Sequence, residues 1–137
     1  MTPLDALSSP LAGINLIEAS AGTGKTWTIA ALYTRLLLEA DAVGQVPGIE
    51  QLLVVTYTKA ATAELRSRLR SRLHDLHAVL AGQATADPFL LAMAARHAGE
   101  SARSIALARL NAAIVSFDTA AIYTIHGFCQ RALTDAA

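Results

Sequence analysis

The sequence lacks the features of a secreted, membrane-spanning or strongly charged protein. Its single cysteine, Cys129, cannot form a disulfide within the chain, which favours a reducing, cytoplasmic location. No apolar run approaches the roughly 18 residues that a membrane-spanning helix needs. The N-terminus has no basic start followed by an apolar run, so we expect no secretion signal. The 11 basic residues balance the 11 acidic ones, so net charge gives no indication of a nucleic-acid partner.

The 137 residues, 53% of them hydrophobic, are enough for one domain with a packed core. We expect an irregular lead-in over residues 1–13 and a domain over residues 14–137. Apolar runs bounded by turn residues predict strands at Ile14–Glu18, Leu52–Thr56 and Ala121–Thr124. Apolar residues at helical spacing predict helices over Lys25 to about Ala40, Lys59 to about Ala81, Pro88–His97, Ser101–Ile114 and Ile125–Leu133. The alternation of strands and helices indicates an α/β fold with a parallel sheet.

Helix-end signals support these boundaries. Thr58 and Asp87 are predicted N-caps, because a short oxygen-bearing side chain accepts hydrogen bonds from the first helical N–H groups. Pro88 follows Asp87 at the first helical position, where its missing N–H costs nothing. Gly82 is predicted to end the long helix.

The segment from residue 19 to residue 26 has the spacing of a phosphate-binding loop, G-x-x-x-x-G-K-[ST], between a predicted strand and a predicted helix. Its residues are Ala19, Ser20, Ala21, Gly22, Thr23, Gly24, Lys25 and Thr26, with Ala19 in the place of the first glycine. The glycines let backbone N–H groups point at phosphate oxygens. Lys25 would reach the terminal phosphates and Thr26 would hold Mg²⁺. The alternative is a glycine-rich turn that binds nothing.

Three blocks of the sequence resemble UvrD/Rep-type superfamily 1 DNA helicases. Residues 19–26 resemble their phosphate loop, Leu52–Arg66 resembles motif Ia, and Ile122–Arg131 resembles the next DNA-contacting motif. The resemblance implies a P-loop, RecA-like first lobe, incomplete at its C-terminal side, that binds ATP, Mg²⁺ and DNA. Within that group the blocks are most similar to the bacterial helicase-exonuclease subunits of double-strand break repair. This similarity implies single- and double-stranded DNA and the gamma and alpha subunits of such an enzyme as partners.

The same resemblance assigns DNA contacts to particular positions. By motif position they are Thr56, Tyr57, Thr58, Thr124, His126 and Phe128. Arg66 and Arg70 belong to the basic cluster that begins within the motif Ia block and would contact phosphates. Each has an alternative. The two aromatic residues and the histidine could lie in the core, and the arginines could form a solvated helix face. We expect Cys129 to be a small buried side chain, and Trp27 to pack inside the fold rather than contact a nucleotide.

A complete hydrolytic site is not predicted for this sequence, because no Asp-Glu pair occurs in it to support Mg²⁺ and activate water. Asp118 ends an apolar run, but Thr119 follows it and not a glutamate. Three hypotheses therefore stay open. The chain is part of a helicase that is inactive by itself, a small P-loop kinase acting on a metabolite, or a non-catalytic module that binds nucleotide or DNA.

Overall fold

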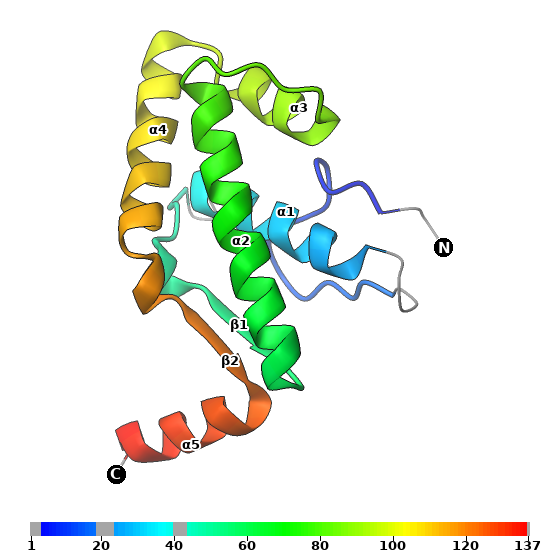
Figure 1. The fold of residues 1–137 in the computed structure, drawn as a ribbon, viewed down its shortest axis with the longest axis vertical. Helices are drawn as coiled ribbons and strands as arrows, with labels where there is room; N and C mark the ends of the chain where they lie inside the picture. Colours follow the sequence, from blue (N-terminus) through cyan, green and yellow to red (C-terminus); the bar gives the residue numbers. More distant parts are fainter. Residues whose placement is uncertain (1–3, 19–23, 40–43, 137) are drawn as a thin grey trace.

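The computed structural model describes residues 4–18, 24–39 and 44–136 (Figure 1). Within these residues all five predicted helices and the second and third predicted strands are present, in the expected order. In chain order they are α1 (Lys25–Leu38), the 3-10 turn η1 (Ile49–Gln51), β1 (Leu53–Thr56), α2 (Lys59–Leu80), α3 (Pro88–Arg96), α4 (Glu100–Val115), the 3-10 turn η2 (Phe117–Thr119), β2 (Ala121–Thr124) and α5 (Ile125–Ala136). None of the described helices is long and apolar enough to cross a membrane.

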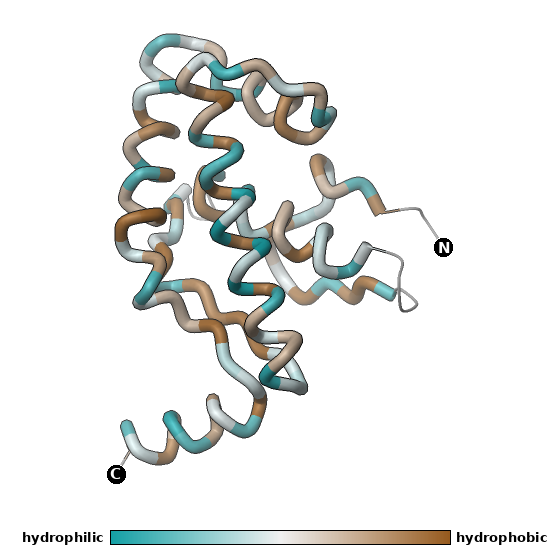
Figure 2. Tube along the Cα trace, in the orientation of Figure 1, coloured by the Kyte–Doolittle hydropathy of each residue, from teal (hydrophilic) through white to brown (hydrophobic). Residues whose placement is uncertain are grey.

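The long helix α2 organises the fold, because α1, α3, α4 and both strands all contact it. The Thr58 hydroxyl accepts a hydrogen bond from the Ala61 N–H at 3.0 Å and begins the helix, as predicted. Gly82, with φ of 115°, follows its end in a conformation that favours glycine. One face of α2 is buried, through Leu65, Leu69, Leu73, Leu76 and Leu80. Hydrophilic and hydrophobic residues therefore alternate along the helix (Figure 2).

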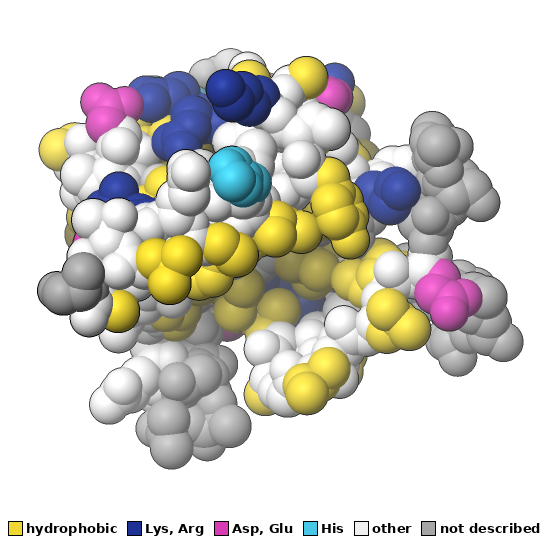
Figure 3. Space-filling view, turned by 90° about the horizontal axis from the view of Figure 1, so that it is seen from below, with side chains coloured by type: hydrophobic (Ala, Val, Ile, Leu, Met, Phe, Trp, Pro, Cys, Tyr) yellow, Lys and Arg dark blue, Asp and Glu magenta, His cyan; other side chains and the backbone are white. Residues whose placement is uncertain are grey.

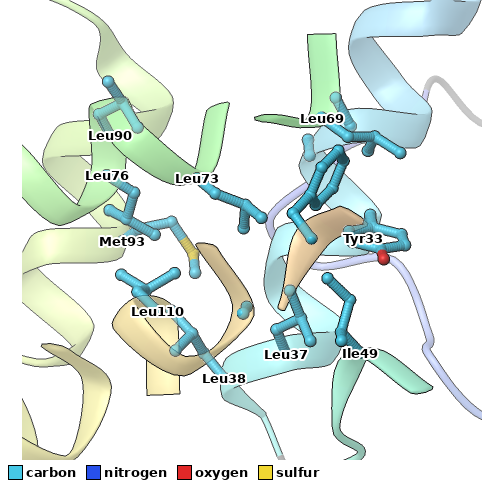
Figure 4. Packing of buried hydrophobic residues seen from close by; sticks show 14 of the residues in the cluster. Tyr33, Leu37, Leu38, Ile49, Leu69, Leu73, Leu76, Leu90, Met93 and Leu110 are labelled. Atoms are coloured by element: carbon cyan, nitrogen blue, oxygen red, sulfur yellow. The ribbon is translucent and has the colours of Figure 1, made fainter. Parts of the chain in front are cut away.

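The core lies between the helices (Figure 4). It joins Tyr33 and Leu37 of α1 to the leucine face of α2, Met93 of α3 and Leu110 of α4. Leu69, Leu73, Leu76, Met93 and Leu110 are fully buried. Fully burying one such side chain stabilises a fold by about 1.5–3 kcal/mol. This contiguous packing gives the helical part of the chain a well-defined interior.

Arg35 fastens the lead-in segment to the helices. Arg35 is 6% exposed, and its side chain donates to the carbonyl oxygens of Ala6 at 2.9 Å and Ser9 at 2.8 Å. It also forms an ion pair with Glu39 at 2.8 Å, and Arg96 of α3 contacts the same carboxylate at 2.6 Å. Burial alone would raise the pKa of Glu39, but its hydrogen bonds and charge interactions with Arg35 and Arg96 lower it.

The two strands form a parallel pair with one covered face. Ile122, 1% exposed, pairs with Val54 on the side that α2 covers, while Leu53 and Val55 on the other side are 49% and 38% exposed. Parallel sheets are normally covered on both faces. Seen from the side where the sheet and α5 lie, hydrophobic side chains form a band beside a hollow (Figure 3). Leu53 and Val55 on this second face are therefore exposed, while the Arg131 guanidinium of α5 lies 5.4 Å from the centroid of the Tyr123 ring that pairs with Val55.

Two sequence predictions were wrong. Residues 14–18 form no strand, and Ile14 and Leu16 are 103% and 84% exposed. A strand needs a hydrogen-bonding neighbour, and in the described ranges β1 and β2 pair only with each other. Cys129 is exposed, because α5 touches the rest of the fold through its first turns and buries none of its described side chains. Trp27, which was expected to pack inside the fold, packs against Phe89 on one side and is 44% exposed.

Candidate nucleotide and nucleic-acid sites

The first turn of α1 carries the described part of the phosphate-loop motif. Gly24 precedes the helix with φ of 85°, a left-handed conformation that residues with a Cβ rarely adopt. The N-cap residue, Gly24, has no side chain that could cap the helix, and the first N–H groups of a helix have no partner within it. Lys25 is exposed and Thr26 is partly buried. Ala19, Ser20, Ala21, Gly22 and Thr23 lie outside the described residues.

These features have the chemistry of an anion site. The N-terminus of a helix carries a partial positive charge and presents backbone N–H groups to an anion. The Lys25 ammonium adds a full positive charge in the same turn, and the Thr26 hydroxyl adds an oxygen ligand suited to Mg²⁺. The N-terminus of α1 can therefore hold a phosphate group by charge and by hydrogen bonding.

The second site is formed where the two parallel strands end. The register pairs Thr56 of β1 with Thr124 of β2, so motif blocks that are far apart in the sequence meet at one edge of the sheet. A helix follows each strand. Thr58 caps α2, and the Thr124 hydroxyl accepts a hydrogen bond from the Gly127 N–H at 3.0 Å at the start of α5. Two helix N-termini therefore begin beside each other, which favours a negatively charged ligand.

The exposed side chains at this edge are suited to unpaired nucleic acid. Tyr57 is 89% exposed, which excludes the interpretation that it is a core aromatic residue. His126 and Lys59 are exposed, and Phe128 is partly buried. An exposed aromatic ring can stack on a base, while helix N-termini and a lysine ammonium can hold the flanking phosphates. The edge therefore combines both kinds of group that bind single-stranded nucleic acid.

Two residues of this edge were missed by sequence reasoning. The Thr62 hydroxyl shares a short hydrogen bond with the Thr56 hydroxyl and also donates to the Thr58 carbonyl oxygen at 3.0 Å. Its position four residues after the predicted cap was the available signal. Gly127 has a steric role, because a Cβ there would lie 3.1 Å from the Thr124 hydroxyl oxygen. Both residues therefore shape the ends of the two strands.

The two candidate arginines have partners inside the protein. Arg66 is partly buried and donates to the Ile122 carbonyl oxygen of β2 at 3.0 Å. Arg70 forms an ion pair with Asp118 at 2.8 Å and places its guanidinium 4.8 Å from the centroid of the Phe117 ring. Both therefore join α2 to the segment that leads into β2. The exposed Arg70–Asp118 pair contributes about 0–1 kcal/mol to stability, so a phosphate can compete for Arg70.

The comparisons with known proteins agree on one family. Residues 3–137 match the family model described as the UvrD/REP helicase N-terminal domain. The chain is 48% identical over 135 residues to RecBCD enzyme subunit RecB of Escherichia coli, a match that covers 95% of the chain and 11% of that protein. It is 43% identical over 142 residues to RecB of Haemophilus influenzae, covering 96% of the chain and 11% of the relative. RecB of Mycobacterium tuberculosis is 36% identical over 118 residues, covering 86% of the chain. The chain spans about a tenth of the length of these curated relatives.

Proposed function

The chain belongs to the UvrD/REP helicase family, and from this premise we propose that it is the ATP- and DNA-binding N-terminal part of an ATP-dependent DNA helicase subunit. The relatives named RecB support a narrower proposal, in which the subunit is a RecB-like helicase and exonuclease of double-strand break repair and recombination. Their name, RecBCD enzyme subunit, supports RecC and RecD, the gamma and alpha subunits of exodeoxyribonuclease V, as protein partners.

The proposed nucleotide site is the loop from Ala19 to Thr26 with the first turn of α1. Residues 14–137 would form the P-loop, RecA-like first lobe, incomplete at its C-terminal side. The left-handed Gly24, the N-terminus of α1 and the exposed Lys25 support triphosphate binding. Thr26 is the proposed Mg²⁺ ligand. The sequence contains no Asp-Glu pair, so the proposal for this chain covers binding and leaves hydrolysis to residues outside it.

The single observation that carries the helicase proposal is the parallel register of Thr56 with Thr124. It joins the two motif blocks at one edge, next to the exposed Tyr57 and the N-termini of α2 and α5. A small metabolite kinase would need neither the pairing of these blocks nor an aromatic side chain exposed beside them. We therefore propose that single-stranded DNA crosses this edge, with Tyr57 stacking on a base and Thr58, Thr124 and His126 close to the backbone.

Two lysines provide a matched test. Lys25 and Lys59 are both exposed and both occupy the first position of a helix. Lys25→Ala should lower Mg-ATP affinity about 10- to 150-fold, since hydrogen bonds to charged groups contribute about 1.5–3 kcal/mol. It should leave DNA affinity unchanged. Lys59→Ala should keep Mg-ATP affinity. For oligothymidylate, it should make the slope of the logarithm of the binding constant against the logarithm of the salt concentration shallower by about 0.7.

Titration calorimetry with Mg-ATP and fluorescence anisotropy with labelled oligothymidylate would measure the two affinities. Circular dichroism would check that both variants keep the helical content of the parent chain. An unchanged Mg-ATP affinity in Lys25→Ala would refute the phosphate-loop role. If both variants lost both ligands equally, the assignment of separate sites would be wrong.

A further inference from the structure

An aromatic contact anchors the helix turn that carries the proposed phosphate ligands. Trp27 follows Thr26 directly, in the first turn of α1. Its ring meets the ring of Phe89 in α3 edge to face, with centroids 5.7 Å apart and planes at 74°. Phe89 is 3% exposed, so it belongs to the rigid core. The turn that holds Lys25 and Thr26 is therefore packed against α3 through Trp27.

Arg72 of α2 completes this contact. Its guanidinium carbon lies 5.5 Å from the centroid of the Trp27 ring and 5.5 Å from that of the Phe89 ring. The same group forms an ion pair with Asp87 at 2.9 Å, and the Arg72 side chain is 11% exposed. Asp87 in turn caps α3 by accepting hydrogen bonds from the N–H groups of Phe89 at 2.8 Å and Leu90 at 3.3 Å. One side chain thus joins the first turns of α1 and α3 to the middle of α2.

The chemistry of this cluster requires arginine. A planar guanidinium can lie against aromatic rings while its edge donates hydrogen bonds to a carboxylate, and a lysine ammonium cannot do both. Asp87 orients the guanidinium, and the guanidinium then contacts the Trp27 ring. Trp27 and the two residues before it share one helical turn, so the contact that holds the Trp27 side chain also holds the backbone from which Lys25 and Thr26 project.

We propose that Arg72 is a positioning residue for nucleotide binding, which holds Trp27 so that the Lys25 ammonium and the Thr26 hydroxyl point at the triphosphate. This inference rests on the proposed nucleotide site. Arg72 does not touch the nucleotide and acts through Trp27. The position of α3 is then linked to Mg-ATP affinity, because Asp87 contacts Arg72 and Phe89 contacts Trp27, both at the start of α3.

The chain contains its own reporter, since Trp27 is the single tryptophan. Three variants separate the contributions. Arg72→Lys keeps the charge and loses the planar group. Asp87→Asn keeps a cap acceptor and loses the ion pair. Arg68→Lys is the matched control, one helical turn before Arg72 and exposed. Mg-ATP affinity, tryptophan emission and oligothymidylate affinity would be measured for each variant and for the parent chain.

We expect Arg72→Lys to bind Mg-ATP about tenfold more weakly, with tryptophan emission shifted to longer wavelength before nucleotide is added. Asp87→Asn should show a smaller loss in the same direction, and it serves as the test if Arg72→Lys does not fold. Arg68→Lys should match the parent chain. Oligothymidylate affinity should stay unchanged in all three, whereas a purely structural role would weaken both ligands together.

The possible failures are distinguishable. Unchanged Mg-ATP affinity in Arg72→Lys, or in Asp87→Asn where that variant replaces it, would overturn the positioning role and leave the nucleotide site intact. An equal loss of Mg-ATP affinity and oligothymidylate affinity would also overturn the positioning role. If the parent chain showed no saturable Mg-ATP binding, the proposed nucleotide site would fail first and the inference with it.

Discussion

Replacing Tyr57 with alanine tests the proposed DNA edge without disturbing the fold. The side chain is 89% exposed, so its truncation removes almost no packing and should change the free energy of unfolding by less than about 0.5 kcal/mol. Stacking of a base on an aromatic side chain contributes about 1–3 kcal/mol. Since about 1.4 kcal/mol corresponds to a factor of ten in affinity, the dissociation constant for oligothymidylate should rise about 5- to 150-fold.

The control is Tyr57→Phe, which keeps the aromatic ring and should retain affinity within about threefold of the parent chain. Fluorescence anisotropy at a fixed salt concentration would give the dissociation constants, and thermal melting would give the stability. If Tyr57→Ala bound oligothymidylate as tightly as the parent chain, base stacking at this edge would be refuted. If Tyr57→Phe lost as much affinity as Tyr57→Ala, the hydroxyl and not the ring would be the binding group.

Three further predictions concern stability. Arg35→Met should lower the free energy of unfolding by about 3 kcal/mol in urea denaturation, because it leaves two backbone carbonyls and part of the Glu39 charge without a partner; a loss below 1 kcal/mol would contradict it. Thr58→Ala should cost about 1 kcal/mol through the lost cap of α2, measured in the same way, whereas Thr58→Ser should cost much less. Burial acts to raise the pKa of Asp87, but hydrogen bonds from Arg72 and two backbone amides lower it below 3.8. Its stabilising contribution is therefore complete above about pH 4 and lost as the pH falls further, so the difference in melting temperature between the parent chain and Asp87→Asn should shrink below pH 4.

Local signals were enough to predict most of the elements. The bounds of α2 and α3 follow from the Thr58 and Asp87 caps, the leucine periodicity and Gly82, and those of β2 from its short apolar run, all of which act within a few residues. The prediction of a parallel sheet was confirmed, since β1 and β2, the second and third predicted strands, pair in parallel.

The predictions that failed depended on distant partners. Residues 14–18 have an apolar composition suited to a strand, but composition cannot supply a neighbouring strand, and the segment is left exposed. Cys129 was expected in the core because cysteine is usually buried, but α5 extends away from the core (Figure 1). The partners of Arg66 and Arg70 lie about 50 residues further along the chain, which no periodicity within α2 can indicate.

The prediction of the nucleotide site depends on residue types and spacing. The structure adds the conformation of Gly24 and the exposure of Lys25. It also adds the contacts of Trp27 and Arg72, which the sequence did not predict because they join three helices. The loop residues before Gly24 stay a prediction from the motif.

Amide chemical-shift mapping of the isotope-labelled chain tests the account most directly, because one sample can be titrated with each ligand in turn. We predict that Mg-ATP shifts the backbone amide signals of Gly24, Lys25 and Thr26, and that oligothymidylate shifts those of Tyr57, Lys59 and His126. The account would be contradicted if Mg-ATP shifted neither Lys25 nor Thr26, for example if its effects fell on the 290 Å³ cavity between Leu37, Ile49 and Arg109.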